Sequence, residues 1–295
     1  MYLSEVTGVS GIEILRDATF ESLGFVSTDT PQLLVFIEAA KYLPELLRNP
    51  LVSAVLATPE LAERIPPHLG VMLADSPRTA FYALHNRLAE IDFYGAPFAS
   101  TIDASARVHP RAFVAETGVR IGARCVIEPH ATVLTGSVLC DDVIIRAGAV
   151  IGGEGFQFAV EADRQILAVA HAGGVWLQSG VEVQHNTVID KAVFGGYTFI
   201  GANCKIDNLV HIAHAVRLGQ RNRVVAGAMI AGSVIAGDDV WFGPMCAVSN
   251  GVKVGAGANI SLGAVVTRDV EPGQRVSGNF AIDHGKLISH LRTIR

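Results

Sequence analysis

The chain has 295 residues, half of them hydrophobic, and a formal net charge of −5 with a pI near 6.0. This length can hold two domains and bury a full core. The acidic balance offers no basic footprint for a duplex, so we expect no nucleic-acid partner. The longest nearly uncharged apolar stretch, residues 224–237, is shorter than the roughly 20 residues that span a bilayer, so we expect no membrane span.

Residues 1–98 are expected to form a small α/β domain. Strands are predicted over residues 33–37 and 53–57, and a short helix over residues 44–48. Ser76 and Pro77 are a favourable cap and first turn for a helix through Leu88. The first residues carry neither the basic cluster nor the apolar segment of a secretory signal, which predicts a cytoplasmic protein.

An apolar residue recurs at every sixth position through most of the second half. The series keeps one phase through Ile200, Ile206, Ile212, Leu218, Val224, Ile230, Ala236, Phe242, Val248, Val254, Ile260 and Val266. Neither an α-helix nor a hairpin strand sustains this period. The residue two places earlier shares the strand face and is small, as at Cys204 and Ala228. Three such units predict one triangular coil of eighteen residues in a parallel β-helix.

The coil is expected to span residues 99–280, with one interruption. Residues 152–174 leave the repeat and carry Glu154, Phe156 and His171. This insertion is predicted to be a loop or small hairpin that projects from the coil, and such insertions commonly build binding sites. Residues 281–295 have apolar side chains at helical spacing. They predict one amphipathic helix that packs against its own coil or a neighbouring subunit.

The cysteines and histidines give no metal-binding pattern. All four cysteines fall inside the repeat, without ligand spacing, which predicts buried thiols rather than disulfides or zinc ligands. His211 and His214 lie three residues apart, with only Asp207 nearby as a third ligand. We therefore expect no metal site.

His214 follows the inward-facing Ile212 by two residues, so it should project from a corner of the coil. One coil later in the sequence, Gly232 should lie directly above it, about 4.8 Å along the axis. The same spacing places Asn250 two coils above and Gly196 one coil below. An outward imidazole beside an unobstructed glycine N–H suits a general base with an oxyanion donor. From spacing alone, a solvated corner histidine is the more common outcome.

Four stretches give the chain a family resemblance. They are Ile151-Gly-Gly-Glu-Gly-Phe156, Ile206-Asp-Asn-Leu-Val-His-Ile-Ala-His214, Ile230-Ala-Gly-Ser233 and Val266-Thr-Arg-Asp-Val-Glu-Pro-Gly273. With the order of α/β domain, coil and terminal helix, they resemble the UDP-3-O-acylglucosamine N-acyltransferase family of hexapeptide-repeat proteins over nearly the whole chain. The resemblance implies a left-handed β-helix and a homotrimer with active sites between adjacent coils. It also implies an acyl-thioester donor whose phosphopantetheine, on acyl carrier protein, lies along the groove.

The resemblance also implies roles for individual residues. His214 matches the catalytic base, and Gly232 matches the backbone donor to the oxyanion. Asp207 and Asn208 match residues beside the acceptor and the acyl chain. The further candidates for substrate binding are Phe36, Lys41, Tyr42, Glu154, Phe156, His171, His211 and Asn250. Phe36 is as readily a core residue of the α/β domain.

The chain departs from the family pattern at several positions, among them the place of a second family histidine, which is replaced near residues 250–252. Ala39 replaces an Asn that bonds uracil, Lys191 replaces the Arg of an Asp-Arg-Gly motif, and Ala215 replaces the Asn after the catalytic His. Alanine cannot make such a hydrogen bond, and lysine lacks the planar fork of arginine.

Three functions therefore stay open. The first is acyl transfer from acyl carrier protein to UDP-3-O-acylglucosamine in lipid A biosynthesis. The second is N-acyl transfer, with CoA as carrier, to another nucleotide-linked amino sugar of surface polysaccharide. The third is a non-catalytic β-helix scaffold.

Overall fold

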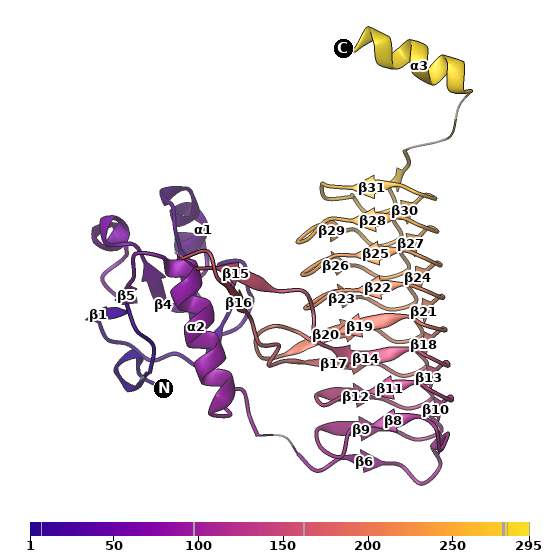
Figure 1. The fold of residues 1–295 in the computed structure, drawn as a ribbon, viewed down its shortest axis with the longest axis horizontal. Helices are drawn as coiled ribbons and strands as arrows, with labels where there is room; N and C mark the ends of the chain where they lie inside the picture. The colour runs from indigo at the N-terminus through magenta and orange to yellow at the C-terminus, as the bar shows by residue number, and fades with distance from the viewer. Residues whose placement is uncertain (7, 97, 162, 279–280, 282, 295) are drawn as a thin grey trace.

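The computed structural model describes residues 1–6, 8–96, 98–161, 163–278, 281 and 283–294. An α/β domain lies beside a long triangular coil, and a C-terminal helix stands beyond the last turn of that coil (Figure 1). Among the described residues, no helix is long and apolar enough to cross a membrane.

The α/β domain is built on a five-stranded sheet with the order β1-β5-β4-β3-β2. Its strands are β1 (Glu13–Arg16), β2 (Ser22–Leu23), β3 (Leu33–Ile37), β4 (Val52–Ala57) and β5 (Gly70–Leu73). Its helices are η1 (Leu3–Glu5), η2 (Ala40–Tyr42), α1 (Leu43–Arg48), η3 (Pro59–Arg64) and α2 (Pro77–Glu90). Only β1 runs antiparallel to its neighbour. The strands predicted at 33–37 and 53–57 and both predicted helices are confirmed.

The coil consists of three parallel sheets, which form the sides of the triangle. The first sheet contains β7 (Arg107–Val108), β10 (Val126–Ile127), β13 (Ile144–Ile145), β18 (Glu182–Val183), β21 (Lys205–Ile206), β24 (Arg223–Val224), β27 (Trp241–Phe242), β30 (Asn259–Ile260) and β32 (Arg275–Val276). The second contains β8 (Phe113–Val114), β11 (Thr132–Val133), β14 (Val150–Gly153), β19 (Val188–Asp190), β22 (His211–Ile212), β25 (Met229–Ile230), β28 (Ala247–Val248) and β31 (Val265–Val266). The third contains β6 (Thr101–Ile102), β9 (Val119–Ile121), β12 (Ser137–Leu139), β17 (Gly174–Leu177), β20 (Tyr197–Ile200), β23 (Arg217–Leu218), β26 (Ile235–Ala236) and β29 (Lys253–Val254).

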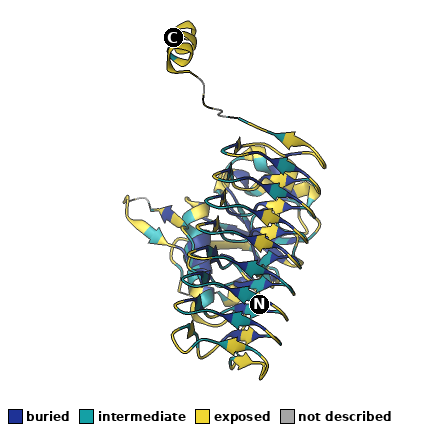
Figure 2. Cartoon of the chain, turned by 90° about the vertical axis from the view of Figure 1, so that its right-hand side faces the viewer, coloured by how far each residue is buried: buried dark blue, intermediate teal, exposed yellow. Residues whose placement is uncertain are grey.

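The period of six is the period of the core. Every position in the predicted series from Ile200 to Val266 is buried, and so are the small partners Cys204 and Ala228. The neighbouring outward residue of a short strand, such as Lys205 on β21, is exposed. Figure 2 shows this alternation along the stacked strands. The predicted parallel β-helix core is therefore confirmed.

The insertion forms an antiparallel hairpin between β14 and β17. Its strands are β15 (Phe158–Val160) and β16 (Ile166–Ala168), and they lie beside α2 (Figure 1). Ala159 and Val169 are buried in the same apolar cluster as Phe81 of α2. The hairpin therefore packs as part of the α/β domain, although in sequence it lies between two strands of the coil.

The C-terminal helix, α3 (His284–Thr293), is capped by the Asp283 side chain, which accepts a hydrogen bond from the Lys286 N–H. None of its residues is buried, and Leu287 and Leu291 are about two-fifths exposed. Of the two predicted partners, the helix's own coil is excluded, because no residue of α3 is buried against the described chain. Packing against a neighbouring subunit stays a prediction.

Truncation of a core residue tests the stacked-coil packing. Ile206 is fully buried on β21 and Lys205 faces outward on the same strand. We expect Ile206→Ala to lower the free energy of unfolding by about 2–5 kcal/mol because it leaves a cavity. Lys205→Ala should cost no more than about 1 kcal/mol, since it removes only exposed contacts. Denaturant titration measures both, and equal losses would contradict the assigned facing.

Candidate active site

His214 and Gly232 are in direct contact on adjacent coils. β22 pairs with β25 so that His211 lies opposite Met229, which places Gly232 above His214. A Cβ atom on Gly232 would lie 2.6 Å from His214 Nε2, so only glycine leaves room for the imidazole. Among the described residues, the Gly232 N–H donates to no backbone carbonyl. The pair therefore offers an imidazole and a free amide donor side by side.

The coil below His214 is longer than the regular repeat. β22 pairs with β19 so that His211 lies opposite Val188, which makes this coil 23 residues long. Counted forward from β19, the residue beneath His214 is Lys191. Counted back from β20, where Phe199 lies opposite Arg217, it is Gly196. The five additional residues therefore lie in the corner beneath His214, which runs from Lys191 to Gly196.

The insertion delivers His171 to this corner of the coil. Its ring centroid lies 5.9 Å from that of His214, and only 4% of the residue is exposed. Nδ1 lies 3.3 Å from Glu154 Oε2, at ion-pair distance. Among the described residues, neither ring nitrogen makes a well-formed hydrogen bond. Apart from the approach of Glu154, this buried imidazole has no partner in the described chain, which is unusual for a buried polar side chain.

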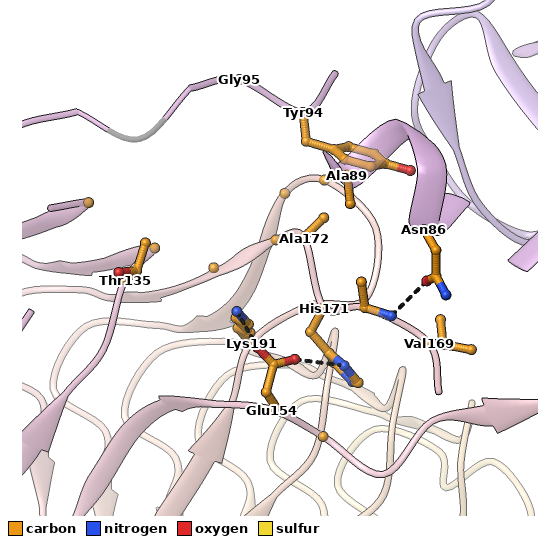
Figure 3. A pocket seen from close by; sticks show the side chains of 18 of the residues that line it. Asn86, Ala89, Tyr94, Gly95, Thr135, Glu154, Val169, His171, Ala172 and Lys191 are labelled. Carbon is orange, nitrogen blue, oxygen red and sulfur yellow. Dashed lines mark hydrogen bonds and ion pairs between the residues drawn. The ribbon is translucent and has the colours of Figure 1, made fainter. Parts of the chain in front are cut away.

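Glu154 also joins the insertion to the coil. Its Oε1 lies 2.6 Å from Lys191 Nζ, and its other oxygen faces His171 (Figure 3). Burial alone would raise the pKa of Glu154, but His171 and Lys191 together lower it to about 2. Glu154 is thus a fixed anion that holds both side chains.

Asp190 ends β19 and lies next to His211. The carboxyl is almost wholly buried, and its Oδ2 lies 3.6 Å from His211 Nε2. Burial raises the pKa of Asp190 to about 6, although His211 and His171 oppose that rise. The His211 side chain is 46% exposed, so it stands between this buried carboxyl and solvent.

Burial also sets the charge state of His214. Desolvation is the main cause that lowers its pKa to about 4, and the neighbouring His171 and His211 lower it further. The imidazole is therefore neutral near pH 7 and has a lone pair that can accept a proton.

A cavity of about 930 Å³ opens beside these residues, between the end of α2, the insertion and the coil (Figure 3). Tyr94, Tyr197, Gly136, Glu154, Lys191 and His171 are among the residues that line it. His171 lines the cavity and its ring lies 5.9 Å from that of His214, so it connects the two.

Helix α2 fixes the backbone that carries His171. Asn86 Oδ1 accepts from the Ala170 N–H at 2.9 Å, and Asn86 Nδ2 donates to the Ala168 carbonyl at 2.8 Å (Figure 3 shows the first bond). His85 Nε2 lies 2.8 Å from the Ala170 carbonyl. Burial lowers the pKa of His85 to about 4, so it is neutral and can donate this bond.

Asp207 and Asn208 lie at the corner before β22, whereas His214 lies at the corner after it. Asp207 accepts hydrogen bonds from the backbone of Asn208 and Ala226, and Asn208 Oδ1 lies 3.0 Å from His185 Nδ1. Within one chain, these two candidates shape their own corner and do not contact the base.

The α/β-domain candidates lie apart from His214. Phe36 packs among aromatic rings, with its centroid 5.0 Å from that of Phe81, and Lys41 lies over the ring of Tyr42. Phe36 therefore contributes to the domain core.

Two further candidates are surface residues. Phe156 is 90% exposed on the insertion, and Asn250 is exposed on the corner two coils above His214. Neither makes a recorded side-chain bond to the base within the described chain.

Sequence reasoning missed Asp190 and treated Lys191 only as a departure from a family motif. Spacing gives no signal that singles out Asp190, because the residue after an inward position is also an acid at Glu128 and Asp207. Within the described part of the chain, no group of three His, Cys, Asp or Glu residues could hold a metal ion.

Comparisons with known proteins show which proteins the chain resembles. The model for "Bacterial transferase hexapeptide (six repeats)" matches residues 118–153 and 197–232, which include both His214 and Gly232. A UDP-3-O-acylglucosamine N-acyltransferase from Helicobacter pylori (strain ATCC 700392 / 26695) is 30% identical over 320 aligned positions, covering 99% of this chain and 94% of that protein. A protein of the same name from Caulobacter sp. (strain K31) is 44% identical over 138 residues, which cover 47% of this chain and 40% of that protein.

One solved structure supports the fold. The UDP-N-acetylglucosamine acyltransferase from Campylobacter jejuni superposes with a TM-score of 0.52 at 22% identity, covering 66% of this chain and 81% of that chain. The predicted fold class, a mainly β left-handed parallel β-helix of hexapeptide repeats, is confirmed.

The buried state of His214 predicts its titration. Its pKa lies below the ordinary value near 6.5, so the unfolded chain binds the proton first and stability falls as the pH drops from about 6.5 toward 4. We expect NMR to give a titration midpoint near pH 4 for this ring, assigned by the signal that His214→Gln removes. The variant should also lose less stability over that window. A midpoint at or above 6.5 would contradict the buried geometry.

Proposed function

Because the chain belongs to the UDP-3-O-acylglucosamine N-acyltransferase family, we propose that it moves an acyl group from a thioester to the amine of a UDP-linked amino sugar in lipid A biosynthesis. The observation on which this depends is the neutral His214 imidazole packed against the open N–H of Gly232. The acyl donor is a phosphopantetheine thioester on acyl carrier protein, or on CoA, and the reaction takes place in the cytoplasm.

The reaction follows from this geometry. The acceptor nitrogen attacks the thioester carbonyl carbon, a C–N bond forms, and the carbonyl oxygen becomes an oxyanion that accepts a hydrogen bond from the Gly232 N–H. His214 takes a proton from the attacking nitrogen. When the C–S bond breaks, the leaving sulfur takes a proton from His214, which restores the neutral imidazole.

The low basicity of His214 suits this step. A neutral amine attacking a carbonyl becomes strongly acidic as the C–N bond forms, so a base with a pKa of about 4 can accept its proton. The same low pKa keeps the imidazole unprotonated before the reaction. His214 is therefore ready at neutral pH without a preceding deprotonation.

Exposed apolar side chains on the coil favour a closed trimer. Leu209 and Met245, on corners of the coil, are 67% and 68% exposed, and Met229, outward on β25, is 41% exposed. Exposed apolar clusters on a soluble enzyme mark interfaces, and a head-to-tail contact that closes gives a ring. In such a homotrimer the groove beside His211 and His214 lies between neighbouring coils.

The three segments divide the work in this proposal. Residues 1–98 hold the nucleotide through a surface that includes Lys41 and Tyr42, residues 99–280 perform the transfer, and residues 281–295 form the terminal helix. Asp207 and Asn208 reach the substrate of a neighbouring subunit's site, since they lie one corner away from their own His214.

A second acceptor is favoured by Ala39. This residue is the N-cap of η2 and makes no side-chain capping hydrogen bond, at the position where the family resemblance implies a uracil-bonding Asn. The alternative is therefore N-acyl transfer to another nucleotide-linked amino sugar. The third possibility, a non-catalytic scaffold, does not explain why an imidazole packs at this corner against a glycine N–H that is unpaired among the described residues.

Loss of the base tests the enzyme assignment. We expect His214→Asn to lower kcat/KM by at least about 10²–10⁴-fold while the trimer persists, because general-base catalysis is removed. His130→Asn is the matched control, since His130 is an exposed corner histidine elsewhere on the coil. Mass spectrometry of UDP-3-O-acylglucosamine with acyl-carrier-protein and acyl-CoA donors measures the product. Unchanged transfer by His214→Asn would refute the site, and no product from any amine would favour the scaffold.

Replacing Ala39 with Asn, which restores the side-chain amide, tests whether the bound nucleotide carries uracil. If the acceptor carries uracil, Ala39→Asn should tighten UDP binding by roughly 2–10-fold, the effect of one net hydrogen bond of about 0.5–1.5 kcal/mol. Ala39→Leu has similar size without the amide and serves as the control. Calorimetry with UDP measures both. A gain in the Leu variant, or none in the Asn variant, would favour another nucleotide.

A further inference from the structure

Two buried polar groups in this corner of the candidate active site have incomplete hydrogen bonding. The His171 side chain is 1% exposed; its Nδ1 has only the 3.3 Å approach of Glu154, and its Nε2 has no partner among the described residues. Asp190 is 4% exposed, and within the same residues its carboxylate accepts no hydrogen bond. Buried polar groups in native proteins are nearly always bonded, so each exception calls for an explanation. Two exceptions in one corner indicate a polar ligand.

The two groups face the same place. The Gly155 backbone packs against both groups, because a Cβ atom built on it would lie 2.6 Å from His171 Nε2 and 3.3 Å from Asp190 Oδ2. These two atoms therefore lie close together, and Gly155 and His171 also line the cavity. The Glu154 carboxylate near His171 Nδ1 favours the tautomer with its proton on Nδ1. Nε2 then presents a lone pair, and the subsite consists of acceptors only.

The charges around this subsite select a cation. The groups that face Asp190 are His171 from the insertion, His211 from β22 and the anion Glu154. The nearest fixed cation, Lys191, is already paired with Glu154 at 2.6 Å. The carboxylate of Asp190 therefore has no permanent counter-ion in the described chain. A small group with several N–H donors and a positive charge fits it best, as an alkylammonium does.

We propose that His171 and Asp190 form the subsite that receives the acceptor amine in its ammonium form. The proposal rests on the proposed function and adds a role for Asp190. An N–H bond of the ammonium breaks and an O–H bond forms on Asp190, which leaves a neutral amine. That amine attacks the thioester, and its second proton goes to His214. One proton is released overall, and the half-exposed His211 gives Asp190 a route to solvent.

The need for two bases is specific to an amine. An ammonium must lose one proton before attack and another during it, whereas a hydroxyl acceptor has only one to lose. Burial raises the pKa of Asp190 and lowers the pKa of His214, so Asp190 is the stronger base of the two. An amine beside electron-withdrawing groups, like an α-amino group, titrates near 8, so much of it arrives protonated at neutral pH. Asp190 thus takes the first proton from the ammonium, for which His214 is too weak a base.

Asp190→Asn tests the proton step. We expect kcat/KM to fall at least about 100-fold at pH 6.5, and the loss to shrink above pH 8, where the amine arrives neutral. Asp142→Asn, an exposed corner acid, is the control and should follow the wild-type profile. An unchanged profile, or a loss that does not vary with pH in a folded variant, would overturn the proposal.

Binding without any acyl donor tests the subsite separately from turnover. Below pH 7, wild-type protein should bind UDP-glucosamine at least about 10-fold more tightly than UDP-N-acetylglucosamine, and Asp190→Asn should bind them equally. Gly155→Ala, which keeps the charges but displaces His171 and Asp190 from each other, should also lose the preference. Absence of an amine preference in the wild type would overturn the subsite. If the preference exists but no acyl transfer is detected, the proposed function fails and the subsite stands.

Discussion

Backbone pairing between successive coils is the constraint on which the site depends. Parallel strands about 4.8 Å apart bring residues eighteen positions apart in the sequence into contact, as β22 and β25 do for His214 and Gly232. At this separation any side chain on Gly232 would collide with the imidazole. The ladders of all three sheets hold the contact in place, which gives a backbone N–H the fixed position that an oxyanion donor requires.

The α/β domain supplies a second constraint, which the coil alone could not provide. His171 lies on a segment that has left the repeat, so no ladder positions it. Asn86 and His85 on α2 bond the backbone at Ala170, and Val169 is buried in the core of the α/β domain. A domain that looks separate in sequence therefore determines where one side chain of the polar cluster lies. Coupling between acceptor binding and catalysis can pass through this contact.

Sequence reasoning succeeded where structure repeats and failed where it does not. The coil and its inward residues follow from local spacing, because each coil repeats the previous one. The corner beneath His214 could not be drawn from spacing, because five additional residues lengthen it: Val188 and His211 are 23 residues apart, whereas Phe199 and Arg217 are 18 apart. The proximity of Asp190 and His171 depends on how an insertion packs against α2, and spacing does not encode that contact. The apolar stripe of α3 identified a face of the helix but not its partner.

The unsatisfied groups beside His214 also explain how the site can be selective. Each buried polar group without a partner costs about 1–3 kcal/mol in the free protein, and a ligand that supplies the partner recovers this energy. Apolar residues in place of His171 and Asp190 would stabilise the fold but would not distinguish an amine from a hydroxyl. The long buried core of the coil contributes enough folding free energy to offset this destabilisation at one corner. Stability from the repeat thus permits a corner whose hydrogen bonds are completed only by the substrate.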